Sequence, residues 1–598
     1  MRRAMTGGHA ALLLALVLSA CDVGVPAPPS EPVPRAPAAE PGGRPQSELQ
    51  KTDPVVVRIQ PTAPTGPLGK LFRPSAMLSW ADAEAVQAFL ALPGRLGTVR
   101  LTLEPILADA SGPDAYRAEL ARGARHLKAL TDRGAELIIT IARMPRWLAS
   151  SQEDTLAGPF GFSRREASPP RDYKAFEQLV YETVLVLNRD HGLSPLYEFW
   201  NEPNGRNFWI GTQDELFRTY AAFVAGARRA DPEARVGGPA VGSWDARWEG
   251  APNDSGPFLK AFFRYASSPP VGVGHGGRLP IDFVSWHNFG VTPEEGWEGV
   301  TEIKRWLAGA GYSPGSPQVV DEWNRWGTFP DWFDPTRDGA LGAAYIPAAL
   351  HEMDRAGVTF QAYAGLQDFN VPRRGEAFIG DFGLLTRQPL IKKAAFHVMN
   401  MLALLEDTRV QISVSPEVVD AEGLGVLATG RPGRVVALLH RFGGEPTGAL
   451  IRSLRRSGYR TLGELGLPAE RVGGFVRRET QLSPSEASPE VRLALERARA
   501  VAEKVRDAPT PEVTLRLQIQ GWTEPVRYRI YRVDKEHGNP AETYQAARRA
   551  GRAHDGALHA ARQREAFAPW AEGTGNLPEL RLGRHAVVLV IVETTKVE

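Results

Sequence analysis

Cysteine is almost absent from this chain of 598 residues, since Cys21 is the only one. Disulfide bonds within the chain are therefore excluded. An excess of either charge is absent as well, because 70 Lys and Arg residues and 69 Asp and Glu residues give a net charge of +1. A nucleic-acid-binding domain usually presents a basic face. The charge balance therefore gives no support to a nucleic-acid partner.

Long apolar runs are scarce too, and the run at residues 10–20 is too short to span a bilayer as a stable helix. Arg2 and Arg3 precede it and small residues lead to Cys21, as in an export signal. This arrangement resembles bacterial lipoprotein signals. The resemblance implies lipidation of Cys21, a mature chain that starts there, and a tether to a membrane outside the cytoplasm. An ordinary cleaved signal with a chance cysteine is the alternative.

The segment after the signal is rich in Pro, Ala, Glu and Gly and holds almost no large apolar side chain. Such a segment cannot bury enough surface to fold, so a disordered spacer is predicted at 21–53. The rest of the chain, about 545 residues, is too long for one core. We expect the signal at 1–20, a first domain at 54–406 and a second at 407–598.

Short apolar runs alternate with helical patterns through the first domain, as in parallel strands buried on both faces. The expected strands are Leu71–Leu78, Gly97–Leu103, Glu136–Ala142, Leu196–Trp200, Ala234–Pro239, Ile281–His287, Gln318–Glu322 and Thr359–Ala364. Eight strand-helix units predict an α/β fold, a TIM (β/α)8 barrel. A doubly wound open sheet is the competitor, but no Gly-rich phosphate loop follows the first strand. Shorter alternating segments after residue 407 predict an antiparallel β-sandwich with helical insertions.

Two carboxylates stand at the predicted mouth of this barrel. Glu202 follows the fourth strand beside Asn201, and Glu322 ends the seventh strand. Active sites of barrels of this type lie where the strands end, so the two residues should face one pocket from opposite walls. Glycosidic bond hydrolysis uses two carboxyl groups, of which one must be a protonated acid with an apolar surround. Phe199 and Trp200 supply apolar walls beside the first.

Several motifs together resemble glycoside hydrolase family 39, a family of retaining barrel glycosidases that includes β-xylosidases and α-L-iduronidases. These motifs are Trp200-Asn201-Glu202-Pro203, Ala142-Arg143-Met144-Pro145, Gly237-Gly238-Pro239, Ser285-Trp286-His287-Asn288, Phe382-Gly383-Leu384-Leu385 and Tyr531-Arg532-Val533-Asp534. The resemblance implies a double displacement with Glu322 as nucleophile and Glu202 as acid/base. It also implies that no metal or organic cofactor is needed.

The resemblance assigns further residues to the site. Arg100 on the second strand is expected to steady the nucleophile and lower its pKa, and Asn201 to hold a sugar hydroxyl. His287 on the sixth strand is expected close to the nucleophile. Aromatic side chains that could stack on sugar faces include Trp286 and Trp323. Each residue also has a plainer interpretation. Arg100 could be an arginine that bridges strands, His287 a hydrogen-bonded core histidine, and the tryptophans core residues.

The catalytic assignments also have alternatives. Glu202 could be a loop carboxylate that caps the following helix. Asp321 could be the nucleophile in place of Glu322, because strict strand alternation turns only one of these neighbours into the pocket. The family usually has Thr at the position of Asp321, and it commonly has His where this chain has Thr102.

The choice of sugar stays open at this stage. In the eighth-strand region only Asp368 matches the acidic cluster usual in β-xylosidases, so a preference for xylose is in doubt. A uronic acid would need a cation, for which Arg325, Arg373 and Arg374 are candidates. The leading prediction is a lipid-anchored retaining hydrolase of oligo- or polysaccharides, β-xylosidase-like. The alternatives are an endo-acting exopolysaccharide hydrolase and an inactive carbohydrate-binding protein on the cell surface.

Overall fold

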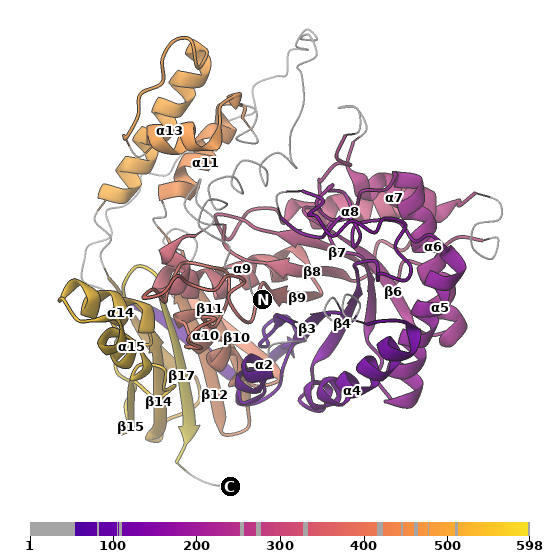
Figure 1. The fold of residues 1–598 in the computed structure, drawn as a ribbon. Helices are drawn as coiled ribbons and strands as arrows, with labels where there is room; N and C mark the ends of the chain where they lie inside the picture. Colours follow the sequence, from indigo (N-terminus) through magenta and orange to yellow (C-terminus); the bar gives the residue numbers. More distant parts are fainter. Residues whose placement is uncertain are drawn as a thin grey trace.

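The computed structural model describes residues 54–595, except for the segments 80–82, 104–105, 107–109, 159, 251–255, 271–276, 327–332, 416–422, 444–445, 460–464, 477 and 509–511. The expected signal peptide, Cys21 and the spacer to residue 53 lie outside the described residues. Two parts are visible in the ribbon, a barrel ringed by helices and a large sheet beside it (Figure 1).

The first part is a closed barrel of eight parallel strands that follow one another in chain order. The strands are β2 (Ala76–Ser79), β3 (Thr98–Thr102), β4 (Glu136–Ile141), β5 (Leu196–Phe199), β6 (Arg235–Val241), β7 (Phe283–Asn288), β8 (Gln318–Trp323) and β9 (Phe360–Tyr363). Pairing of Ala76 with Tyr363 closes the ring between β2 and β9. The predicted (β/α)8 barrel is therefore confirmed, and the doubly wound open sheet is excluded.

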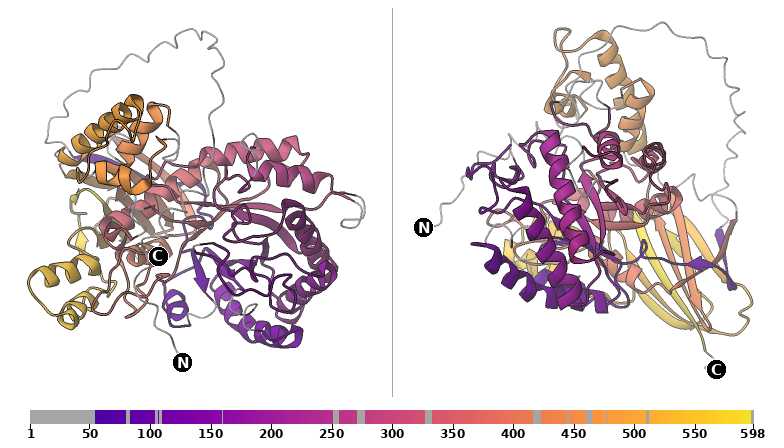
Figure 2. Two further views of the ribbon diagram at one scale, coloured as in Figure 1. Left: turned by 45° about the horizontal axis from the view of Figure 1, so that its top comes forward. Right: turned by 90° about the vertical axis from the view of Figure 1, so that its right-hand side faces the viewer.

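A helix follows each barrel strand, and these helices surround the barrel (Figure 2). They are α2 (Ala83–Leu90), α4 (Pro113–Asp132), α5 (Tyr173–Val184), α6 (Gln213–Ala230), α7 (Phe258–Ser267), α8 (Glu298–Gly309), α9 (Ala340–Ala356) and α10 (Ala394–Ala403). A π-helical turn, η2 (Leu185–Asp190), extends α5, and a 3₁₀ turn, η3 (Pro335–Asp338), precedes α9.

Local sequence sets the ends of these helices. At the start of α6 the Thr212 hydroxyl accepts from the backbone N–H of Glu215, whose carboxylate accepts in turn from the backbone N–H of Thr212. This reciprocal capping satisfies two donors that a helix start leaves free. At the end of α9, Gly357 takes φ 85°, a left-handed conformation that glycine adopts at little cost. These signals, together with the apolar runs of the strands, explain why the expected elements lie close to the observed ones.

The second part is a mostly antiparallel sheet of nine strands in the order β15-β14-β17-β12-β11-β10-β1-β13-β16. The strands are β1 (Val55–Pro67), β10 (Thr408–Ser415), β11 (Leu424–Arg431), β12 (Arg434–Arg441), β13 (Val513–Ile519), β14 (Val526–Val533), β15 (Ala571–Gly575), β16 (Leu580–Leu582) and β17 (Ala586–Thr594). The predicted separate β-domain is confirmed. One strand comes from the other end of the chain, since β1 pairs antiparallel with β10 and parallel with β13. The expected boundary grouped residues 55–67 with the barrel, whereas their hydrogen bonds lie in this sheet.

One face of this sheet is buried along its whole width, and the central strands β11, β12 and β17 are buried on both faces. One face of all the long strands contributes to a single apolar cluster that includes Ile59, Leu439, Leu515 and Val590, and no helix of the described chain contributes to it. The sheet therefore curls so that its two ends cover each other, which gives a sandwich-like core from one continuous sheet. The opposite face packs on the barrel through contacts of α9 with β12 and β17, and of α10 with β14.

Helices are inserted between the strands of the second part. Between β12 and β13 lie α11 (Pro446–Arg456), α12 (Ala469–Val476) and α13 (Pro489–Asp507), which have an apolar core of their own that includes Leu454 and Leu495. They project from the top of the molecule in Figure 1. Between β14 and β15 lie α14 (Pro540–Arg549) and α15 (His554–Arg562). The second part thus carries helical insertions, as expected.

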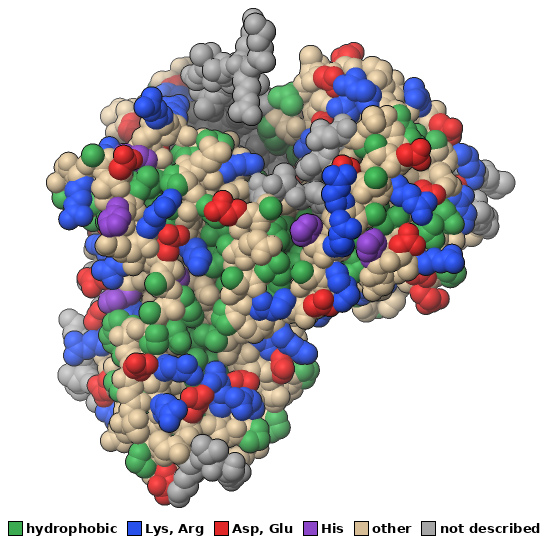
Figure 3. Space-filling model, turned by 60° about the horizontal axis from the view of Figure 1, so that its bottom comes forward, with side chains coloured by type: hydrophobic (Ala, Val, Ile, Leu, Met, Phe, Trp, Pro, Cys, Tyr) green, Lys and Arg blue, Asp and Glu red, His purple; other side chains and the backbone are tan. Residues whose placement is uncertain are grey.

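The surface carries mixed charges. On the face drawn in Figure 3, basic and acidic side chains are interspersed, with apolar side chains between them. This mixture agrees with the net charge of +1. None of the helices in the described ranges has the length and apolar character required to cross a membrane.

Candidate active site

The candidate acid/base lies in a sharply turned loop after β5. Trp200 has φ 62° and Glu202 has φ 44°, both in the left-handed region that L-residues rarely adopt. The Trp200 indole is fully buried, donates to the carbonyl of Phe208 at 2.8 Å and packs edge-on against Trp209. The backbone N–H of Glu202 donates to the carbonyl of Ala240 on β6 at 2.8 Å. These contacts hold the strained turn and direct Glu202 across the end of the barrel.

Arg100 on β3 joins the two expected catalytic segments. Its Nη1 lies 2.9 Å from Oε2 of Glu322, and its Nη2 donates to Oδ1 of Asn201 at 2.8 Å. Its Nε lies 2.9 Å from carboxylate oxygens of both Glu198 and Asp321. The arginine is completely buried, so these contacts replace its hydration. Arg100 thus connects β3 with β5 and β8, and one of its contacts is with the candidate nucleophile Glu322.

His287 on β7 lies between the two carboxyl groups. Its Nδ1 is 2.8 Å from Oε1 of Glu202, and its Nε2 is 3.6 Å from Oε2 of Glu322. The ring is fully buried, whereas the side chains of Glu202 and Glu322 retain 26% and 17% exposure. The structure therefore brings Glu202 and Glu322 to the accessible side of one site, with a single imidazole between them.

The pairing of β7 with β8 corrects one expectation. Trp286 pairs with Val320 and His287 pairs with Glu322, so Asp321 is an extra residue in β8, a β-bulge. Strand alternation is interrupted there, and both neighbouring carboxylates turn towards Arg100 and His287. The expected alternation of these two side chains is therefore wrong. They differ instead in access, because the side chain of Asp321 is fully buried.

Burial and charge act against each other on the ionisable groups. Burial raises the pKa of Glu322, although His287 and Arg100 act in the opposite direction. The expected lowering by Arg100 is thus present but outweighed. Burial alone would lower the pKa of His287, yet Glu322 and Asp321 hold it well above its usual range. Although burial opposes it, Arg100 and His287 hold the pKa of Asp321 below its usual value. Burial raises the pKa of Glu198 to about 7.

Comparison with known proteins assigns the chain to a family. The family model for glycosyl hydrolases family 39 matches residues 124–438, which is more than half of the chain. The chain belongs to this family. The match includes β5, β7 and β8, and therefore Glu202, His287 and Glu322.

Relatives of this family 39 chain include two curated β-xylosidases. That of Geobacillus stearothermophilus is 24% identical over 362 residues, covering 56% of this chain and 62% of the relative. That of Caldicellulosiruptor saccharolyticus is 25% identical over 300 residues, covering 47% and 56%. The chain thus spans about three fifths of the length of these relatives.

Solved structures share the fold over nearly the whole chain. A monomeric β-xylosidase from Caulobacter crescentus CB15 has a TM-score of 0.62 at 17% identity, covering 90% of this chain and 100% of that one. The family 39 enzyme from Xanthomonas axonopodis pv. citri has a TM-score of 0.62 at 18% identity, covering 92% and 100%. At these identities the likeness supports the fold, including the β-domain.

Most of the tryptophans considered as sugar platforms are core residues in this family 39 barrel. Trp286 is fully buried and packs against Trp297 just before α8. Trp323 is 1% exposed, donates from Nε1 to Gln361 and packs against Tyr345 on α9. Both point out of the barrel towards the helices, so the structure does not bring them to the carboxylates. Trp326 is partly exposed beyond the end of β8, next to Phe289.

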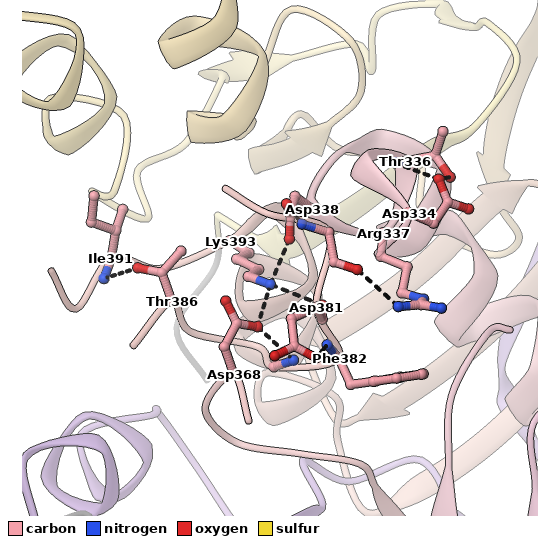
Figure 4. A network of polar contacts seen from close by, with 12 residues as sticks. Asp334, Thr336, Arg337, Asp338, Asp368, Asp381, Phe382, Thr386, Ile391 and Lys393 are labelled. Atoms are coloured by element: carbon pink, nitrogen blue, oxygen red, sulfur yellow. Dashed lines mark hydrogen bonds and ion pairs between the residues drawn. The ribbon is translucent and has the colours of Figure 1, made fainter. Parts of the chain in front are cut away.

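Asp368 lies in a second buried network and not beside the carboxylates of the site. Its Oδ1 is 2.6 Å from Nζ of Lys393, which also lies 2.5 Å from Oδ1 of Asp338 (Figure 4). Asp368 also accepts from the backbone N–H of Gly383 at 2.9 Å. At 1% exposure it ties the loop after β9 to the start of α10. Its observed contacts are therefore structural.

One supporting residue, Glu198, had no assigned role in the sequence, and the contact of Asp321 with Arg100 was not expected either. Glu198 accepts from Arg100 at 2.9 Å and from Thr140 at 2.7 Å, and Asp321 lies on the other side of Nε. A signal for this pairing was present, because Arg100 and Glu198 both lie inside strands predicted to be buried. Charged residues are almost never fully buried unless they are paired. The partnership was not evident because a whole strand, β4, lies between β3 and β5.

In the ranges that the structure describes, no group of three or more His, Cys, Asp and Glu side chains is arranged to hold a metal ion.

Proposed function

We propose that this protein is a retaining glycoside hydrolase in which Glu322 attacks the anomeric carbon and Glu202 protonates the departing oxygen. In the second step Glu202 accepts a proton from water, and the water oxygen displaces Glu322. The position of His287 is the observation that carries this proposal, because one imidazole contacts both carboxyl groups, at 2.8 Å and 3.6 Å. Two carboxyl groups this close suit a nucleophile and an acid/base that reach the same bond.

The neighbours of each carboxylate fit its proposed role. Arg100 donates to Oε2 of Glu322, which favours the ionised form that an attack requires. The same guanidinium donates to Oδ1 of Asn201. The Nδ2 of Asn201 has no hydrogen-bond partner among the described residues. That Nδ2 is the group we assign to the 2-hydroxyl of the sugar, where hydrogen bonds strengthen in the transition state.

For the substrate we propose a β-xyloside or a similar neutral glycoside. The two curated relatives are β-xylosidases, which points in this direction. A uronic acid would need a cation in the pocket, but Arg325 is 1% exposed and paired with Asp334 at 2.6 Å. Arg373 and Arg374 are exposed on the loop after β9. The buried arginine nearest in sequence to the nucleophile is thus already committed to a carboxylate.

A panel of aryl glycosides tests this proposal. Purified protein is assayed on 4-nitrophenyl β-xyloside, α-arabinoside, β-galactoside, β-glucoside and α-iduronide, and Glu322→Ala is the matched control. Release of nitrophenol that disappears in the variant supports the mechanism, and activity that survives contradicts it. No release from any glycoside, together with breakdown of a polysaccharide, favours the endo-acting alternative. Binding of sugars without any hydrolysis favours the carbohydrate-binding alternative.

We also propose that the mature chain is held by lipid at Cys21 to a membrane outside the cytoplasm. The proposal rests on the signal-like residues 1–20 and on the position of the only cysteine directly after them. The Pro-rich residues that follow would hold the barrel away from the membrane surface.

A further inference from the structure

Asp321 is a buried carboxylate that the double displacement does not itself require. The bulge in β8 turns it to the same side as Glu322, where its Oδ2 lies 2.9 Å from Nε of Arg100 and 3.5 Å from Nε2 of His287. It is fully buried, so it does not touch solvent or a sugar in the pocket. A buried charge is costly unless it compensates another charge. Its partners indicate which charge it compensates.

The charges around His287 come from three directions. Glu202, on the loop after β5, faces Nδ1 at 2.8 Å, and Asp321 and Glu322, on β8, face Nε2 at 3.5 Å and 3.6 Å. Arg100, on β3, contacts both β8 carboxylates and also Glu198 on β5. Both ring nitrogens thus face carboxyl oxygens, which suits a ring that carries a proton on each nitrogen.

Covalent catalysis changes this balance at one step. When Glu322 attacks, its oxygen bonds to the anomeric carbon, the glycosidic bond breaks, and the proton of Glu202 leaves with the departing oxygen. Esterified Glu322 no longer carries a charge. If it were the only anion beside Nε2, the imidazolium would pass its Nδ1 proton to Oε1 of Glu202. Glu202 would then be protonated at the moment when it must accept a proton from water.

We propose that Asp321 is a positioning residue that keeps His287 doubly protonated while Glu322 is esterified, so that Glu202 stays ionised as the base of the second step. This inference rests on the proposed retaining mechanism. Asp321 is suited to the task because it does not react and because it is already paired with Arg100, whose Nε lies 2.9 Å from its Oδ2. The first step needs it less, since ionised Glu322 is then present beside the ring.

The inference predicts a specific kinetic pattern for Asp321→Asn. With 2,4-dinitrophenyl β-xyloside, kcat should fall at least about tenfold, because a general base typically contributes 10²- to 10⁴-fold. KM should fall in proportion, so that kcat/KM changes little, and a burst of dinitrophenol should precede slow turnover. The acid limb of kcat should move to higher pH, where Glu202 loses its proton again. Asp321→Thr, also uncharged, should behave in the same way.

Glu198→Gln is the matched control, because Glu198 contacts Arg100 but not His287. It should not produce the burst or move the acid limb of kcat. Equal losses in kcat and kcat/KM in both Asp321 variants, without a burst, would show that Asp321 only supports the fold and would overturn the inference. A wild-type protein that neither turns over the glycoside nor forms a glycosyl-enzyme would overturn the proposed function as well.

A second measurement reads the histidine directly. The full-length protein is labelled with ¹⁵N-histidine and trapped with 2-deoxy-2-fluoro-xylosyl fluoride, and His287→Gln assigns the resonance. At pH 7 the ring in the trapped wild-type protein should give the two similar nitrogen shifts of an imidazolium, and the ring in Asp321→Asn those of a neutral imidazole. A neutral ring in the trapped wild-type protein contradicts the inference.

Discussion

Nη1 of Arg100 lies 2.9 Å from Oε2 of Glu322, across the barrel from the strand that the arginine belongs to. The same guanidinium reaches Asn201 through Nη2. One planar side chain therefore fixes the distance between the segment of the nucleophile and the segment of the acid/base. A planar fork can hold two partners in a set geometry in a way that an ammonium group cannot.

Arg100→Lys should damage both stability and activity. Lysine keeps one charge but cannot contact Glu322, Asn201, Glu198 and Asp321 together. Breaking a buried ion pair costs about 3–5 kcal/mol, which sets the expected loss in the free energy of unfolding by urea. kcat/KM should fall roughly 10²- to 10³-fold, as when one stabilising donor is removed from an active site. Full activity in a folded variant would contradict the assigned role.

Glu202→Ala should separate substrates by their leaving groups. Loss of a general acid typically costs about 10²- to 10⁴-fold, and the cost falls on departing groups that need a proton. Turnover of an unactivated xylobioside should therefore collapse, whereas the first step with a dinitrophenyl glycoside should persist. Added azide should restore turnover and give the β-azide with this variant, but the α-azide with Glu322→Ala. Product configurations determined by NMR check both roles, and the reverse pairing would exchange them.

Asn201→Ala tests the proposed contact with the sugar. For a substrate with a 2-hydroxyl, kcat should fall, because the variant loses several kcal/mol of transition-state stabilisation. With a 2-deoxy glycoside the wild-type protein has no such contact to lose, so the substitution should lower kcat much less. The comparison requires kcat for both proteins on both substrates. Equal losses on the two substrates would place the role of Asn201 in its bond to Arg100 instead.

The positions of the two catalytic candidates could be predicted because parallel strands buried on both faces leave short, continuous apolar runs. Once the strands were counted, Glu202 and Glu322 fell at the same end of the barrel. The directions of individual side chains could not be predicted where the backbone departs from regular alternation. The bulge at Asp321 adds one residue to β8 and reverses the expected faces there. It turns Asp321 to the same side as Glu322, whereas Trp323 follows regular alternation and packs on the outer helices.

Long-range pairing was also beyond the sequence patterns. The first strand of the β-domain, at 55–67, is separated from its partner β10 by the whole barrel. Apolar periodicity shows that such a segment is a strand but not which sheet it joins. Asp368 illustrates the same limit, because a carboxylate after the last barrel strand looks like a sugar ligand until Lys393 is placed 2.6 Å from it.

Cys21→Ser tests the membrane tether. If Cys21 carries lipid, the wild-type protein should sediment with membranes and take up labelled palmitate when it is expressed in a bacterium with lipoprotein processing. The variant should appear in the soluble fraction of the exported material with no label. Its glycosidase activity should be unchanged, since the described barrel begins well beyond residue 21. Label-free wild-type protein in the soluble fraction would support the alternative of an ordinary cleaved signal.

Asp368→Asn should change how stability depends on pH. Burial raises the pKa of Asp368 to about 7, even though Lys393 acts against it. An aspartate in the unfolded chain has a pKa near 3.9, so between about pH 4 and pH 7 the folded state holds a proton that the unfolded state has lost. Folding stability from this group is therefore greatest at low pH and falls as pH rises towards 7.

The size of this effect has an upper limit of roughly 4 kcal/mol, from about three pKa units at 1.36 kcal/mol each. Asparagine resembles the protonated carboxyl and cannot ionise. The variant should therefore lie closest to the wild-type protein in stability at pH 5 and gain on it by pH 8. Urea unfolding of both proteins at the two pH values measures the difference. If the stabilities of the two proteins changed with pH in parallel, Lys393 would keep Asp368 ionised at both pH values. The proton taken up by this network would then lie on Asp338, whose pKa burial also raises.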